Sequence, residues 1–179
     1  MRCTELVELT AELAPSCGPV RVVAVDGGAG AGKTTLAGRL AHAHPRARVL
    51  HLDELLDGWA GQFGYRDRLH EQVFRPLADG QPARYQRYDW TREQFADWVE
   101  LPVPDLLIVE GVSAVWGCDR WLGLGVFLAL DRMDRLRRWI ERDGPAQPEW
   151  LAWLEAEDAF FGRHPVSGDR VRIVDGGVE

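Results

Sequence analysis

The sequence lacks several features that mark common classes of protein. Its three cysteines, Cys3, Cys17 and Cys118, are scattered and odd in number, so neither a disulfide framework nor a cysteine metal site is expected. The five histidines show no metal-ligand spacing. No stretch approaches the roughly 18 apolar residues that a membrane-spanning helix needs, and the N-terminus lacks a signal-peptide pattern. We therefore expect a cytoplasmic protein whose cysteines are buried or incidental thiols.

Basic charge is also in short supply. The chain has 21 Lys and Arg residues against 28 Asp and Glu residues, which gives a net charge of -7 at pH 7. Because phosphate backbones attract basic surfaces, this balance argues against nucleic acid as the main partner. A local basic cluster could still bind a small phosphate compound. We expect a small-molecule partner, no nucleic acid and no membrane, and leave a homodimer open.

Apolar runs alternate with helical patterns along the whole chain, without an internal repeat or a long linker. The strands are expected at residues 20–26, 48–52, 106–109, 126–130 and 170–174. The helices are expected at residues 4–14, 34–43, 66–77, 91–98, 134–142 and 149–161. Such alternation predicts an α/β fold in which helices cover both faces of a parallel central sheet. At 179 residues, the chain fits a single domain over 1–179.

A glycine-rich loop satisfies the pattern G-x-x-x-x-G-K-[ST] in full, between a Val-rich strand and a helix. The motif predicts that the nucleotide is bound by Gly27, Gly28, Ala29, Gly30, Ala31, Gly32, Lys33, Thr34 and Thr35. Glycines allow successive N–H groups to point inward at phosphate oxygens. Lys33 would reach the outer phosphates, and the Thr34 hydroxyl is a natural magnesium ligand. The motif alone does not distinguish a kinase from an ATPase or a GTPase.

Three acidic residues, Asp26, Asp53 and Glu110, stand at the carboxyl ends of expected strands, where open parallel sheets bind ligands. Asp53 could accept a proton from an attacking hydroxyl or hold a magnesium-bound water. Alternatively, it could cap a helix. Glu110 fits the second acid that holds magnesium, partly through water. Asp26 precedes the loop and has the position of a structural residue that orients either the loop or the water shell of the metal.

Arg135, Arg138 and Arg142 recur at spacings of three and four, which places them on one helical face. A lid segment around residues 132–147 could bring these arginines over a triphosphate and stabilise the transferred group. A solvated face, balanced by neighbouring acids, is the equally supported alternative.

Aromatic residues gather between the second and third expected strands, at Trp59, Phe63, Tyr65, Tyr85, Tyr88 and Trp90. They suit a flat or sugar-bearing substrate, or an ordinary core. The later tryptophans Trp139, Trp150 and Trp153 fall on helical patterns, which indicates packing.

Five stretches together resemble the uridine kinase and phosphoribulokinase-like group of P-loop kinases. They are VAVDGGAGAGKTTLA (23–37), HLDELLDGW (51–59), RYDW (87–90), LIVEGV (107–112) and RLRRWIERD (135–143). They follow the family's order and cover most of residues 20–143. The resemblance implies the three-layer P-loop NTPase sandwich and phosphorylation, with ATP and Mg²⁺, of a hydroxyl on a small molecule, most simply a nucleoside.

The same resemblance implies roles for single residues. Asp53, Lys33 and Arg138 would be catalytic, with Asp53 as the general base. The acceptor would be bound by Asp53, Asp67, Tyr88, Asp89, Trp90 and Arg138, the nucleotide also by Arg135 and Arg142, and Mg²⁺ by Thr34 and Glu110.

The sequence departs from the family after the Tyr-Asp-Trp stretch. Thr91-Arg92-Glu93 stands where uridine kinases soon have a base-reading histidine, and the basic run after the lid helix is replaced by residues 144–148. Asp67 is the best remnant of the family's substrate loop. Two alternatives therefore stay open. A nucleoside monophosphate kinase would use Arg66, Arg68, Arg84 and Arg87 in its acceptor pocket, and a regulatory nucleotide-binding module would not transfer phosphate.

Overall fold

The computed structural model describes residues 1–176, so the last three residues of the expected domain lie outside the described part. Five parallel strands form the central sheet in the order β2-β5-β1-β6-β7. They are β1 (Arg21–Asp26), β2 (Ala47–His51), β5 (Leu106–Glu110), β6 (Leu124–Ala129) and β7 (Val171–Asp175). All five strands expected from the sequence are confirmed. The carboxyl ends of β1, β2 and β5 meet at one edge of the sheet, because the three strands pair in parallel register.

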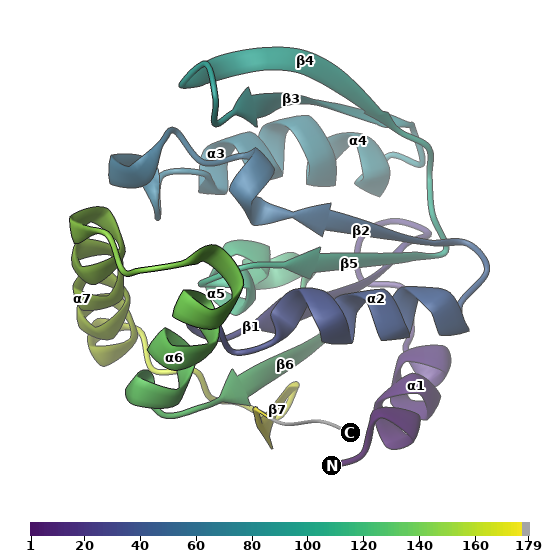
Figure 1. Ribbon diagram of the computed structural model, residues 1–179. Helices are drawn as coiled ribbons and strands as arrows, with labels where there is room; N and C mark the ends of the chain where they lie inside the picture. Colours follow the sequence, from purple (N-terminus) through teal and green to yellow (C-terminus); the bar gives the residue numbers. More distant parts are fainter. Residues whose placement is uncertain (177–179) are drawn as a thin grey trace.

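Helices cover both faces of this sheet, which confirms the α/β sandwich (Figure 1). On one face, Val23 and Val25 pack in a cluster with Leu36 and Leu40 of α2 (Lys33–Ala43) and with α1 (Cys3–Glu12). On the other, their neighbours Val22 and Ala24 join a larger cluster. The elements on that side and at the carboxyl edge are α3 (Arg66–Arg68), α4 (Arg75–Ala78), α5 (Ala114–Cys118), α6 (Arg132–Asp143) and α7 (Pro148–Arg163).

The helix expected at residues 66–77 is one continuous helical segment from α3 to α4 with a π-helical stretch, Leu69–Phe74, in its middle. Pro76 follows that stretch and has no N–H to donate, so the ordinary hydrogen-bond ladder is interrupted there. Three short 3-10 helices complete the elements, at Leu52–Glu54, Trp59–Gly61 and Asp119–Trp121.

The helix expected at residues 91–98 is wrong. This segment belongs to an antiparallel hairpin of β3 (Ala83–Asp89) and β4 (Gln94–Leu101), which lies apart from the central sheet (Figure 1). Asp89 accepts hydrogen bonds from the backbone N–H groups of Thr91 and Arg92. The Asp89 side chain therefore closes a turn at the position where Thr91 was expected to cap a helix. Cross-strand pairs such as Tyr88 with Phe95 then hold the hairpin together.

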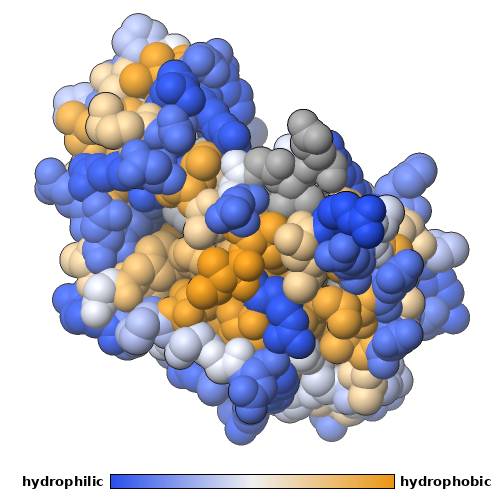
Figure 2. Space-filling view, turned by 90° about the horizontal axis from the view of Figure 1, so that it is seen from below, coloured by the Kyte–Doolittle hydropathy of each residue, from blue (hydrophilic) through white to orange (hydrophobic). Residues whose placement is uncertain are grey.

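The face seen from below carries hydrophobic residues near its middle (Figure 2). Edge strand β7 lies on this side of the molecule, and its Ile173 is 63% exposed. Within residues 1–176 there is no helix with the length and apolar character that a bilayer crossing demands.

The homodimer left open by the sequence stays a prediction.

Candidate active site at the carboxyl edge of the sheet

The phosphate loop, residues 27–34, joins β1 to α2 as the sequence predicted. Gly27, Gly30 and Gly32 have φ angles of +138°, +81° and +98°, which side chains other than hydrogen rarely tolerate. Gly28 and Gly30 also have no room for a side chain, because Arg135 packs against them. A Cβ atom on Gly28 would lie 1.9 Å from Nη1 of Arg135, and one on Gly30 would lie 2.4 Å from the Arg135 carbonyl oxygen. Helix α6 therefore lies directly against the loop.

Asp26 anchors the start of this loop. Its buried carboxylate accepts hydrogen bonds from the backbone N–H groups of Gly27 (2.6 Å), Ser113 (2.8 Å) and Val115 (3.0 Å). Burial raises the pKa of Asp26 to about 6, although these donors and Lys33 oppose the shift. The carboxylate thus ties the loop to the segment after β5. This is the structural role that its sequence position indicated.

Lys33 and Thr34 open α2 and face the cavity. The ammonium group of Lys33 donates to the carbonyl oxygen of Gly28 at 3.0 Å, and the Thr34 hydroxyl donates to Oε1 of Glu110 at 3.1 Å. Lys33 is also the only lysine in the sequence. Because α2 begins at Lys33, its free N–H groups add positive potential at the same place.

His51 is a residue that the sequence interpretation missed. Its Nδ1 lies 2.5 Å from Oε1 of Glu110, since the two residues are register partners on the neighbouring strands β2 and β5. The hydrogen bond to Glu110 raises the pKa of His51. The sequence places His51 two residues before Asp53, which could have marked it as a site residue. Its contact with Glu110 becomes visible only once the order of the strands is known.

Asp53 lies in the 3-10 turn that follows β2. The N-cap of that turn is His51, so Asp53 does not have the capping position that the alternative interpretation required. Its carboxylate is exposed to the cavity, but the surrounding protein removes enough water to raise the pKa of Asp53, with Lys33 acting in the opposite direction. A carboxylate with a raised pKa is a better proton acceptor than one in open water.

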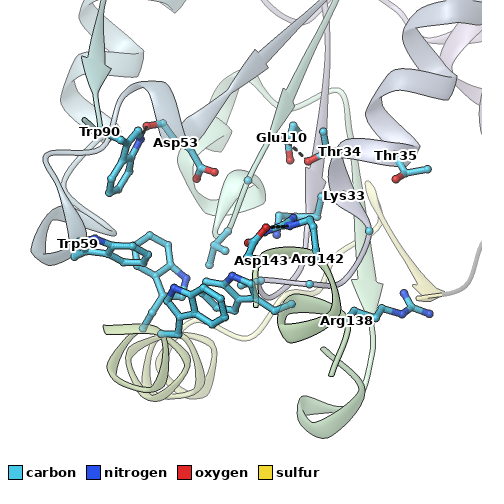
Figure 3. Close-up of a pocket in the computed structure, with 18 residues that line it drawn as sticks. Lys33, Thr34, Thr35, Asp53, Trp59, Trp90, Glu110, Arg138, Arg142 and Asp143 are labelled. Carbon is cyan, nitrogen blue, oxygen red and sulfur yellow. Dashed lines mark hydrogen bonds and ion pairs between the residues drawn. The ribbon is translucent and has the colours of Figure 1, made fainter. Parts of the chain in front are cut away.

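A cavity of about 560 Å³ collects most of the predicted site residues (Figure 3). From the expected set, its lining includes Ala29, Gly30, Gly32, Lys33, Thr34, Thr35, Asp53, Trp90, Glu110, Arg138 and Arg142. Asp53 lies between Trp90 and the loop residues, whereas Arg138 lies on the opposite side, beyond Lys33 (Figure 3). Arg138 donates to the carbonyl oxygen of Gly176 at 3.0 Å, and Arg142 is paired with Asp143 at 2.6 Å.

Other predicted residues lie outside this lining. Arg135 is buried against the loop, where it pairs with Glu157 at 2.7 Å. Tyr88 packs between Trp90 and Phe95, Asp89 closes the hairpin turn, and Asp67 is exposed on α3. Their roles toward nucleotide or acceptor stay predictions. Within the loop itself, Gly27, Gly28 and Ala31 shape the backbone without lining this cavity.

The four arginines of the nucleoside monophosphate kinase alternative do not line the cavity either. Arg66 pairs with Asp119 and Arg87 with Asp97. Arg84 pairs with Glu100, and Arg68 donates to the carbonyl oxygen of Leu55. An acceptor phosphate in the cavity would therefore meet none of them.

The later tryptophans pack as expected, and they also line the cavity, which sequence reasoning did not foresee. Trp139, Trp150 and Trp153 are 6%, 8% and 8% exposed. Trp139 and Trp150 stack with their ring centroids 4.7 Å apart. Together with Trp59 and Trp90 they make up five of the residues that line the cavity.

No protein-family model matches the sequence, and no curated protein matches it either. Solved structures do match the fold over nearly the whole chain. A possible uridine kinase from Bacillus stearothermophilus is similar with a TM-score of 0.68 and 20% identity, over 95% of this chain and 96% of the other. A candidate fructose transport system kinase from Silicibacter sp. TM1040 is similar with a TM-score of 0.63 and 22% identity, over 90% of this chain and 89% of the other.

A candidate P-loop kinase with a circular permutation, from Saccharomyces cerevisiae, gives a TM-score of 0.61 and 8% identity, over 98% and 99% of the two chains. At these identities the likeness establishes the fold. The chain therefore has the P-loop kinase fold, and residues 27–34, the acids Asp53 and Glu110 and the cavity lie at one edge of the sheet.

Proposed function

We propose that this protein is a kinase that transfers the γ-phosphate of ATP to a hydroxyl of a small molecule, with a nucleoside-like compound as the leading class. One observation carries the proposal: the Asp53 carboxylate opens onto the same cavity as Lys33 and Thr34. A nucleotide-binding module needs the loop, but it has no use for an additional carboxylate of raised pKa beside it.

The triphosphate of ATP, as substrate, would lie along residues 27–34 with its outer phosphates near Lys33. The ammonium group supplies a positive charge there, and Arg142 and Arg138 line the same cavity from α6. Such fixed charges stabilise the charge that develops on a transferred phosphoryl group.

The residues present also fit a magnesium ion. The Thr34 hydroxyl oxygen and Oε1 of Glu110 lie 3.1 Å apart, so a hydroxyl and a carboxylate oxygen meet at one point beside the loop. Residues 1–176 contain no group of three or more His, Cys, Asp or Glu side chains placed to hold a metal. This fits Mg²⁺, which uses few protein ligands and completes its shell with phosphate oxygens and water. When bound, the ion would neutralise phosphate charge.

Asp53 would accept the proton of the acceptor hydroxyl as that oxygen attacks the γ-phosphorus. The raised pKa of Asp53 predicts a loss of activity toward acid pH, because the protonated carboxyl cannot accept a proton. The acid limb of the pH profile for kcat/KM should therefore lie above the ordinary pKa of an aspartate.

ADP release over a panel of nucleosides, sugars, other alcohols and nucleoside monophosphates tests the proposal. We expect a hydroxyl compound to stimulate release in the wild-type protein. Asp53→Asn should lower kcat by about 10²-fold or more while ATP still binds. Asp57→Asn, an exposed neighbour, should behave like the wild type. Stimulation by monophosphates alone, or unchanged transfer by Asp53→Asn, contradicts the proposal.

A further inference from the structure

Tryptophan is concentrated at the candidate site far beyond its share of the sequence. Of the eight tryptophans in the chain, five line the one cavity that contains Lys33 and Asp53. We call Trp59, Trp90, Trp139, Trp150 and Trp153 the tryptophan wall. Its members come from the segment after β2, the hairpin turn, α6 and α7, so the wall is assembled by the fold rather than by a local run.

The wall has a closed base and an open mouth. Trp139 and Trp150 stack at the base with an interplanar angle of 15°. At the mouth, Trp59 meets Trp90 edge-on and also meets Trp153 edge-on, each with ring centroids 5.5 Å apart. Trp59 and Trp90 are 43% and 37% exposed. Aromatic surface of Trp59 and Trp90 therefore remains accessible to a ligand.

Most polar ends of the wall are already occupied by the protein. The indole N–H of Trp90 donates to the carbonyl oxygen of Asp53 at 3.0 Å, and that of Trp153 donates to Oε1 of Glu157 at 2.7 Å. Trp139 hydrogen-bonds Asp143, which contributes to the lowered pKa of that carboxyl. The N–H groups of these three rings are therefore already used within the protein, and the exposed aromatic surface of the wall belongs to Trp59 and Trp90.

The rest of the lining supplies few neutral polar groups. Apart from Thr34 and Thr35 on α2, the residues lining this cavity include no Ser, Asn, Gln, Tyr or His. The charged residues of the lining are Lys33, Asp53, Glu110, Arg138, Arg142 and Asp143. Arg142 and Asp143 are paired with each other, and Arg138 donates to the carbonyl oxygen of Gly176. A polyol or a sugar acid needs a partner for each hydroxyl, and each unpaired one would cost free energy on binding.

We infer that the acceptor is a planar aromatic alcohol, whose ring lies against the tryptophan wall and whose hydroxymethyl group reaches Asp53. This inference rests on the proposed kinase activity, and it narrows the acceptor from nucleoside-like compounds in general to an aromatic alcohol without a sugar ring. In the transfer, the acceptor oxygen forms a bond to the γ-phosphorus, the bond from that phosphorus to the β,γ-bridging oxygen breaks, the hydroxyl proton passes to Asp53, and ADP leaves. The hydrogen bond from Trp90 to the Asp53 backbone fixes the distance between wall and base.

The test uses hydroxymethylpyridine as the aromatic probe, with gluconate and uridine as the polar comparisons. Trp59→Leu removes an exposed member of the wall, and Trp98→Leu is the matched control. Trp98 is 47% exposed on β4 and does not line the cavity. We expect ADP release to favour hydroxymethylpyridine over gluconate, and Trp59→Leu to raise its KM about tenfold with kcat nearly unchanged. Trp98→Leu should leave both constants unchanged.

A binding measurement separates this inference from the proposed function. Hydroxymethylpyridine without nucleotide should quench tryptophan fluorescence saturably, with a Kd that rises about tenfold in Trp59→Leu but not in Trp98→Leu. Absence of saturable quenching overturns the inference whether or not phosphate is transferred. Preference for gluconate, or for uridine with a KM that Trp59→Leu does not change, also overturns it. Saturable binding without ADP release from any alcohol instead overturns the proposed function.

Discussion

Glu157 accepts a hydrogen bond from the backbone N–H of Ala29 at 2.9 Å, across 128 residues of sequence. The same carboxylate accepts from Trp153 and pairs with Arg135. A fully buried acid of α7 therefore holds both the phosphate loop and one member of the tryptophan wall. This one side chain therefore links the positions of the proposed nucleotide and acceptor subsites.

Glu157→Ala should lower the free energy of unfolding by about 3 kcal/mol, because it leaves the buried Arg135 guanidinium without its closest partner. Urea denaturation measures this change. Glu155→Ala, at an exposed position of the same helix, should stay within about 0.5 kcal/mol of the wild type. Equal stability of the two variants would show that the pair does not hold α7 to the loop.

Lys33 offers a direct test of triphosphate binding, since it is the only lysine in the sequence. An amine-reactive reagent should label Lys33 and the N-terminal amine, and saturating ATP with Mg²⁺ should protect Lys33 alone. Mass spectrometry of the labelled peptides measures this, with the N-terminal peptide as the internal control. Labelling of Lys33 that ATP leaves unchanged would contradict the assignment of the loop.

Replacement of the same residue should remove transfer. Lys33→Met keeps the length of the side chain but loses its charge, so kcat/KM for ATP should fall by about 10²- to 10³-fold. Arg46→Met, at an exposed surface ion pair with Asp105, is the control and should leave kcat/KM unchanged. A Lys33→Met variant with near-normal transfer would exclude Lys33 from catalysis.

Asp26 predicts a pH dependence of stability. Its pKa is raised from the usual 3.8 to about 6 in the folded protein, so the folded state binds this proton more tightly than the unfolded state does. The stability that this tighter proton binding gives to the folded protein is fully present below the unfolded pKa of Asp26. It is lost as pH rises through the folded pKa. The loss amounts to about 3 kcal/mol across that interval.

Asp26→Asn has no proton to release, so its free energy of unfolding should not show this fall. The comparison is the difference in stability between wild type and variant, measured by urea denaturation at several pH values. Asp79→Asn, at an exposed position, should keep the slope of the wild type. A difference between wild type and Asp26→Asn that does not change with pH would contradict the raised pKa.

Much of the fold could be predicted from the sequence because its signals are local. Val-rich and Leu-rich runs marked the strands of the sheet, and the spacing of glycines, Lys33 and Thr34 marked the phosphate loop. The hairpin was missed because its turn depends on the Asp89 side chain. Thr91 is a residue type that commonly caps helices, so the sequence favoured a helix there. His51 and Glu157 act through partners on distant elements, which no local pattern contains.

The close approach of Arg135 to Gly28 and Gly30 limits how α6 can move. The first turns of this helix are fastened to the loop by a buried ion pair, so swinging the whole helix away would expose the Arg135 charge. Freedom remains only toward its far end, where Arg142 and Asp143 precede Gly144, whose φ is +96°. If the site closes over a bound nucleotide, the hinge should lie within α6 rather than before it, and the early turns should resist hydrogen exchange.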